Sequence, residues 1–124
     1  MSRILVVDDE PGTQTLVVEY LGLSGHQAVP CPDGESALGL LNRDPAFDLV
    51  VLDKRLPGLS GDDVLKAIRS DPRLKALPVI MLSASVQAGD LKDGPQAADL
   101  YMAKPLHPRE LASAVDRLLQ AQRG

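Results

Sequence analysis

Short aliphatic runs alternate along this chain with longer segments of mixed polarity. Four of the runs are clear, at residues 3–7, 49–52, 79–82 and 100–103. Aliphatic runs of this length, bounded by polar residues, are typical of strands buried on both faces of a parallel sheet. A weaker run at 27–31 contains Pro30 and precedes Pro32, which indicates an edge strand because proline cannot donate to a ladder. The pattern predicts five parallel strands.

The segments between these runs carry apolar residues at the spacing of amphipathic helices. Helix starts are indicated at Pro11, Asp33, the Ser60–Asp63 capping box and Pro108. The first helix is expected to end at Gly22 and Gly25, and Pro72 closes the third. The residues expected to face the sheet are Leu16, Val17, Tyr20, Leu21, Ala37, Leu38, Leu41, Val64, Leu65, Ile68, Leu111, Val115, Leu118 and Leu119.

A further helix is expected between Ser85 and Asp99, but the sequence there disfavours a regular one. Gly89 and the Gly94–Pro95 pair interrupt the segment. Proline inside a helix removes a hydrogen bond and clashes with the preceding turn, at a cost of about 3 kcal/mol or more. We therefore expect a short, displaced or mobile helix in this segment.

Strands that alternate with helices predict a doubly wound α/β fold. The (βα)5 pattern gives a three-layer sandwich in which right-handed crossovers place helices on both faces of a parallel sheet. A length of 124 residues suits one domain with a substantial core. Residues 1–124 are therefore expected to form a single domain.

Composition and charge exclude several classes of function. The formal net charge is −4 and the isoelectric point is about 5.0, so the chain lacks the basic surface of a nucleic-acid-binding protein. No apolar run approaches membrane-spanning length, and the start Met1-Ser2-Arg3 is expected to lead into a strand and not to be a signal peptide. The single cysteine, Cys31, excludes an internal disulfide and fits a reducing compartment. We expect a cytoplasmic protein without direct contact to nucleic acid or membrane.

Polar residues stand at the carboxyl ends of four predicted strands. They are Asp8, Asp9, Asp53, Ser83 and Lys104. In open α/β sheets the carboxyl ends of the strands border one crevice, so three carboxylates, a hydroxyl and an amine are expected to converge. Clustered carboxylates repel one another unless a cation neutralises them, and oxygen ligands suit Mg²⁺. The pattern indicates a site that handles phosphoryl groups.

The motifs that contain these residues resemble those of the receiver domain of two-component response regulators. The resemblance extends from Arg3 to about Gln122. The motifs are Asp8-Asp9, Asp53-Lys54-Arg55-Leu56-Pro57-Gly58-Leu59-Ser60-Gly61, Ser83-Ala84, and Tyr101 three residues before Lys104-Pro105. The resemblance implies a flavodoxin-like sheet of strand order 2-1-3-4-5, as in the chemotaxis regulators of this family.

The resemblance also implies a phosphoacceptor and a metal site. Asp53 is the expected nucleophile, which takes a phosphoryl group from the phosphohistidine of a partner. Mg²⁺ is the expected cofactor. Its implied ligands are Asp9, Asp53 and the backbone carbonyl of Arg55, with Asp8 bound through water.

Three further residues are implied to sense the phosphoryl group. Lys104 and the Ser83 hydroxyl are expected to contact its oxygens, and Tyr101 is expected to move with Ser83 as a switch. The implied partners are a sensor histidine kinase or phosphotransfer protein and a downstream protein target. Formation of a phosphorylation-dependent dimer is a further possibility that the resemblance leaves open. The chain is thus expected to be a signalling module and not a turnover enzyme.

Two other functions stay open at this point. A pseudo-receiver would bind partners without accepting phosphate, although the complete set of acidic residues disfavours it. Haloacid-dehalogenase-like phosphatases also use a nucleophilic aspartate and Mg²⁺, but their acidic residues follow an Asp-x-Asp pattern that this chain lacks. Single residues have plainer explanations too, with Asp8 or Asp9 as helix caps, Lys104 as a surface lysine and Tyr101 as a static aromatic residue.

Overall fold

The computed structural model describes residues 2–44, 46–83, 97–103 and 107–123 and shows one sheet of five parallel strands. The strands are β1 (Arg3–Val7), β2 (Gln27–Cys31), β3 (Leu49–Asp53), β4 (Val79–Ser83) and β5 (Leu100–Ala103). Their order is β2-β1-β3-β4-β5, which confirms the expected order and places the proline-containing β2 at an edge. The strand order reverses between β1 and β3, which is where ligands bind in such folds.

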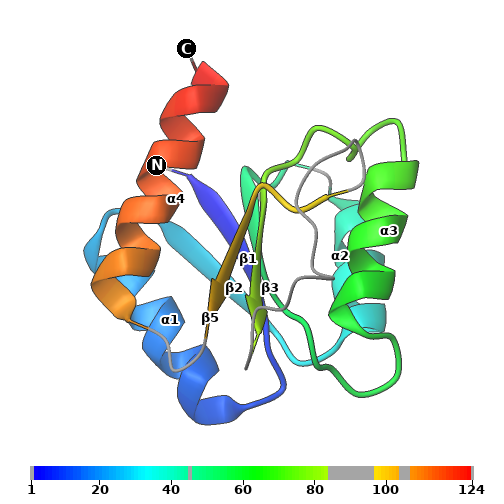
Figure 1. Ribbon diagram of the computed structural model, residues 1–124, viewed down its shortest axis with the longest axis horizontal. Coiled ribbons are helices and arrows are strands. Elements are labelled where there is room, and N and C mark those ends of the chain that lie inside the picture. The colour runs from blue at the N-terminus through cyan, green and yellow to red at the C-terminus, as the bar shows by residue number, and fades with distance from the viewer. Residues whose placement is uncertain (1, 45, 84–96, 104–106, 124) are drawn as a thin grey trace.

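Four helices within the described residues cover the two faces of this sheet. They are α1 (Pro11–Leu23), α2 (Gly34–Arg43), α3 (Gly61–Ser70) and α4 (Pro108–Arg123). α1 and α4 lie on one face, and α2 and α3 lie on the other (Figure 1). The predicted doubly wound three-layer sandwich is therefore confirmed. The helix expected between Ser85 and Asp99 falls largely on residues 84–96, which lie outside the described residues.

The sheet is buried on both faces because each pair of helices covers one of them. Val50 and Leu52 of β3 belong to the core on the side of α2 and α3. Leu49 and Val51 belong to the core on the side of α1 and α4. This alternation with burial on both sides explains why the strands are continuous aliphatic runs.

The starts of α2 and α3 follow the capping residues of the sequence. The Asp33 carboxylate accepts a hydrogen bond from the Ser36 amide at 2.7 Å. Ser60 and Asp63 form the predicted capping box, in which each side chain accepts from the backbone amide of the other residue. These bonds satisfy amides that the first turn of a helix leaves without a partner.

α1 differs from the prediction at one position. The expectation that Leu16 faces the sheet is wrong, because its side chain is 40% exposed while Val17 and Leu21 are buried. The helix ends at Leu23, between the two glycines predicted to end it, and the chain turns at Gly25, which has a φ of +90°. Apolar residues occupy most sides of α1, so their spacing does not define one buried face.

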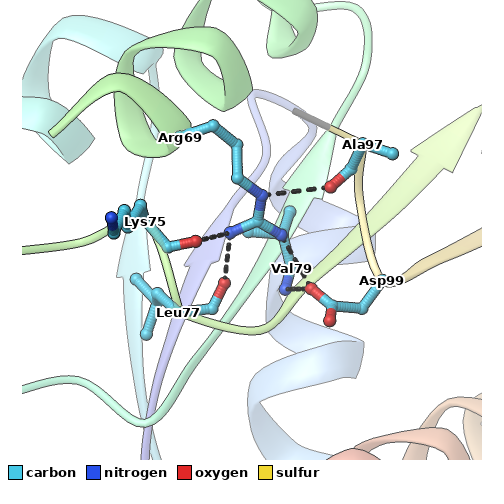
Figure 2. Close-up of polar contacts among 6 residues, drawn as sticks. All are labelled: Arg69, Lys75, Leu77, Val79, Ala97 and Asp99. Carbon is cyan, nitrogen blue, oxygen red and sulfur yellow. Dashed lines mark hydrogen bonds and ion pairs between the residues drawn. The ribbon is translucent and has the colours of Figure 1, made fainter. Parts of the chain in front are cut away.

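A buried arginine fastens the amino ends of β4 and β5 to α3. The side chain of Arg69, in the last turn of α3, is 5% exposed. It donates to three backbone carbonyl oxygens, those of Lys75 at 3.1 Å, Leu77 at 2.6 Å and Ala97 at 3.0 Å (Figure 2). It also donates to the Asp99 carboxylate at 2.7 Å, and the same oxygen accepts from the Val79 amide at 2.9 Å. The planar guanidinium fork, with several donors in fixed directions, suits this set of acceptors.

Replacing Arg69 is expected to destabilise the fold strongly. Arg69→Met keeps a long side chain but removes the donor for three carbonyls and Asp99, at a cost of about 2–4 kcal/mol. Arg73→Met is the matched control, because the Arg73 side chain is 50% exposed and exposed ion pairs contribute little. Urea denaturation measures both variants. An equal loss of stability in the two would show that the buried network contributes no more than a surface pair.

The start of α3 lies directly against the end of β3. The Gly61 amide donates to the Lys54 carbonyl oxygen at 2.8 Å. A β-carbon added at Gly61 would stand 2.3 Å from the Asp53 carbonyl oxygen and 2.7 Å from the Lys54 α-carbon. Because both are backbone atoms, no side chain is available to move aside. Glycine at this position is what lets α3 approach the residue that ends β3.

Gly61→Ala is expected to displace the backbone at Asp53 and to lower the free energy of unfolding by about 1–3 kcal/mol. Gly39→Ala is the control, since a β-carbon added at that α2 position meets no atom within 4 Å. There the lower entropy of the unfolded chain should raise stability by about 0.5–1 kcal/mol. Thermal unfolding of the two variants tests whether stability falls in Gly61→Ala and rises in Gly39→Ala. A stabilised Gly61→Ala variant would contradict the steric argument.

Candidate functional site

Buried polar side chains gather at the carboxyl edge of the sheet, at the lower end of the strands in Figure 1. Asp8 follows β1 and is 2% exposed, Asp53 ends β3 and is 5% exposed, and Ser83 ends β4 and is 6% exposed. Asp9 is exposed. Asp8, Asp53 and Ser83 are thus polar groups removed from water, each at the carboxyl end of a largely aliphatic strand.

Strand register brings Asp8 and Asp53 side by side. β1 and β3 pair Val7 with Leu52, and the next residue on each strand is an aspartate. Asp8, Asp9 and Asp53 each offer a carboxylate oxygen, and the three oxygens lie within 4.8 Å of one another. The convergence of these three carboxylates, predicted from the strand ends, is therefore present.

This donor set fits a hard divalent cation. All three ligand atoms are carboxylate oxygens, and Mg²⁺ prefers oxygen ligands and usually retains several waters. Asp9 is exposed, so the group is open to solvent on one side, as an ion that keeps waters requires. Three like charges this close disfavour one another, and a cation would relieve that repulsion.

Local backbone bonds orient the two buried carboxylates. Asp8 Oδ1 accepts from the Glu10 amide at 2.9 Å, and Asp53 Oδ1 accepts from the Arg55 amide at 3.3 Å. In both cases the aspartate bonds to the backbone two residues further on, which is the geometry of an Asx turn. The N-cap of α1 is Glu10, so the plainer explanation of Asp8 or Asp9 as its cap does not hold.

The loop between β3 and α3 is held against α2. Gly58 adopts a φ of +74°, which side chains rarely tolerate. The Leu59 amide donates to the Glu35 carboxylate at 3.4 Å. This contact joins the segment that follows Asp53 to the first turn of α2, so the loop beside the site has support from a second element.

The remaining predicted site residues are placed to different extents. Ser83 is buried at the end of β4, and Tyr101 is half-buried in β5, packed against the core on the α2 and α3 side. The Arg55 side chain is exposed. Lys104 lies outside the described residues. The roles of these residues as phosphoryl contacts, switch and metal ligand stay predictions.

Cys31 lies beside the site but does not extend it. It is buried, and its backbone carbonyl accepts from the Asp8 amide at 3.1 Å. Burial, with a smaller contribution from the negative charge of Asp33, raises the pKa of the Cys31 thiol. The thiol therefore stays protonated near neutral pH, whereas a metal ligand would be a thiolate.

Three residues hold the site in place through contacts that the sequence did not predict. Gln14 donates to the Asp8 carbonyl, Glu35 accepts from the loop after β3, and Gly61 makes room for Asp53. Gln14 stands between Thr13 and Thr15 at the start of α1, so its polarity did not set it apart. The contacts of Glu35 and Gly61 depend on elements brought together by folding.

Comparison with known proteins identifies the same family that the sequence motifs resemble. The family model described as the response regulator receiver domain matches residues 4–116. The phosphate regulon transcriptional regulatory protein PhoB of Escherichia coli K12 is 36% identical over 119 residues, which are 95% of this chain and 52% of PhoB. The transcriptional regulatory protein CpxR of the same organism is 38% identical over 121 residues, 97% of this chain and 50% of CpxR. The chain thus spans about half the length of these relatives.

Solved structures agree with this match. The chemotaxis protein CheY4 of Vibrio cholerae superimposes with a TM-score of 0.87 at 26% identity, over 95% of this chain and 98% of CheY4. The residues matched by the family model include Asp8, Asp53 and Ser83. On this evidence the chain belongs to the response regulator receiver domain family of two-component systems.

Proposed function

We propose that this chain is a phosphoacceptor in which Asp53 takes a phosphoryl group from a partner's phosphohistidine. The observation that carries the proposal is the buried Asp53 carboxylate at the end of central strand β3, with Asp8 and Asp9 oxygens within 4.8 Å. Receiver domains are signalling modules that interact with histidine kinases. The proposal treats residues 1–124 as one such domain.

The transfer is an in-line displacement at phosphorus. An Asp53 oxygen forms a bond to phosphorus while the bond between phosphorus and the partner's imidazole nitrogen breaks. The imidazole keeps the bonding electron pair and takes up a proton. Such transfers depend mainly on positioning and on stabilising the charge of the phosphoryl oxygens. The Arg55 amide supports the first requirement, because its bond to Asp53 Oδ1 at 3.3 Å orients the carboxylate.

Asp8, Asp9 and Asp53 would hold Mg²⁺, with the Arg55 carbonyl as a further ligand, and Asp8 would act through water. Receiver domains bind Mg²⁺ at an acidic pocket, and this carboxylate cluster suits one. When bound, the ion offsets the negative charge that gathers on the phosphoryl oxygens. The bond from the Glu10 amide would help to hold the Asp8 carboxylate in place for this role.

Lys104 and Ser83 are proposed to contact the phosphoryl oxygens, and Ser83 and Tyr101 to transmit the change. Ser83 is buried at the end of β4, the strand next to β3, which supports its part. Tyr101 lies on β5, the next strand, and is half-buried against the core. Movement of a half-buried ring would alter the surface there, which is how a local charge change reaches a protein partner.

The proposed partners are a sensor histidine kinase or phosphotransfer protein and a downstream protein target, in the cytoplasm. PhoB and CpxR are named transcriptional regulators, and this chain matches about half of each. Absence of direct nucleic-acid contact is therefore proposed for the receiver alone. Within the described ranges, no helix combines the length and hydropathy needed to cross a bilayer.

The central prediction is self-labelling with a small phosphodonor. With Mg²⁺ and acetyl phosphate or phosphoramidate, the chain is expected to gain one phosphoryl group on Asp53, because nucleophile and metal site belong to the chain itself. Asp53→Asn and an excess of chelator should both abolish the hydroxylamine-sensitive product, whereas Asp62→Asn, on the exposed surface of α3, should label normally. Intact mass measures the gain. A chain that stays unlabelled with several donors would be a pseudo-receiver.

Removal of one clustered charge is expected to stabilise the metal-free protein. In chelator, Asp53→Asn should unfold at a higher temperature than wild type, by about 1 kcal/mol or a few degrees, because like charges repel less. Millimolar Mg²⁺ should raise the melting temperature of wild type more than that of Asp53→Asn. Asp62→Asn should show neither effect. A lower melting temperature for Asp53→Asn in chelator would refute the repulsion argument.

A further inference from the structure

The side-chain amide of Gln14 bridges the ends of two strands. Its Nε2 donates to the Asp8 carbonyl oxygen at 3.0 Å and to the Cys31 carbonyl oxygen at 3.2 Å. Gln14 lies in the first turns of α1, and the carbonyls follow β1 and end β2. One side chain therefore links a helix to both strands at the carboxyl edge of the sheet.

Hydrogen bonds hold the backbone of Asp8 at both its amide and its carbonyl. Its amide donates to the Cys31 carbonyl at 3.1 Å, and its carbonyl accepts from Gln14. Its carboxylate accepts from the Glu10 amide at 2.9 Å. The direction of the Asp8 carboxylate, and the path of the chain into Asp9, are therefore set by groups outside Asp8 itself.

A side-chain donor is useful here because the strand ladder ends at this point. β1 and β2 pair as far as Val7 and Cys31. The Asp8 amide donates to the Cys31 carbonyl, so a continued ladder would need the Asp33 amide at the Asp8 carbonyl, but Asp33 is already the N-cap of α2. A parallel ladder cannot continue past a chain that turns into a helix, and Gln14 donates to the carbonyls at its end.

We propose that Gln14 is a positioning residue of the metal site, which fixes the Asp8-Asp9 segment so that its carboxylates meet the Asp53 carboxylate. This inference rests on the proposed function, because it assigns Gln14 a role toward the cation. Groups that hold a ligand residue typically matter for affinity as well as for stability. Gln14 donates to the backbone carbonyls of Asp8 and Cys31, so it would act on the ion through the backbone that carries the carboxylates.

Cation affinity separates this role from a purely structural one. Mn²⁺ binding is followed by the electron paramagnetic resonance of the free ion, and unfolding is measured separately in chelator. Gln14→Met has similar length and no donor, and should weaken Mn²⁺ binding about tenfold, whereas Gln14→Arg keeps donors and should stay within about twofold of wild type. Gln120→Met, the same change on the exposed surface of α4, should leave the affinity unaltered.

The phosphorylation rate gives a second readout. At limiting Mg²⁺ the Gln14→Met variant should label slowly, and at saturating Mg²⁺ its rate should approach that of wild type, because Gln14 does not contact the phosphoryl group. If Gln14→Met fails to fold, Gln14→Leu provides the same comparison, since it also lacks a donor and adds no charge near the carboxylates.

Each result points to one conclusion. Wild-type Mn²⁺ affinity in Gln14→Met, even with lowered stability, would overturn the positioning role and leave the proposed function intact. Weak binding in Gln14→Arg as well would also overturn it, because the donors would then not be what matters. A wild-type chain that binds no Mn²⁺ at millimolar concentration would instead refute the proposed metal site.

Discussion

Crowding of negative charge at the ends of two neighbouring buried strands is the constraint on which the rest of the structure depends. Asp8 and Asp53 are almost fully buried, and Asp9 places a third carboxylate oxygen within 4.8 Å of theirs. Carboxylates removed from water and placed together are unfavourable unless amides and a cation compensate them. The fold supplies the amides directly, and it holds the carboxylates in an arrangement that a divalent ion would stabilise.

Each of the first three helices supports this charge cluster in a different way. α1 contributes the Glu10 amide at its start and the Gln14 side chain, while α2 contributes the Glu35 carboxylate that accepts from the loop after β3. α3 packs directly against the end of β3, because Gly61 has no side chain to separate the helix from Asp53. Reactive groups carried by strand ends and held by helix starts keep their geometry better than groups on free loops.

The sequence predicted all five strands to within one residue, because burial on both faces forces a continuous aliphatic pattern. The site residues at their ends followed from the same pattern, but the strand order required the family resemblance, since hydrophobicity does not say which strands are neighbours. Leu16 was placed on the wrong side because α1 is apolar around most of its circumference. Gly61 was part of the quoted motif, but its close approach to Asp53 was not predicted, and Arg69 gave no signal because most of its partners are backbone atoms brought near by folding.

The Arg69 network ties together the amino ends of two strands, far from the carboxylate cluster. At the amino ends of β4 and β5, one guanidinium joins three carbonyls and a carboxylate, and Val79 and Asp99 also pair through their backbones at 2.9 Å. Amides in such a network open rarely and exchange slowly with solvent. The clustered carboxylates lie at the opposite edge of the sheet, at the carboxyl ends of β1 and β3, where Ser83 also ends β4. If the proposed change at Ser83 and Tyr101 takes place, the Arg69 bonds would hold the amino ends of β4 and β5 together while their carboxyl ends move.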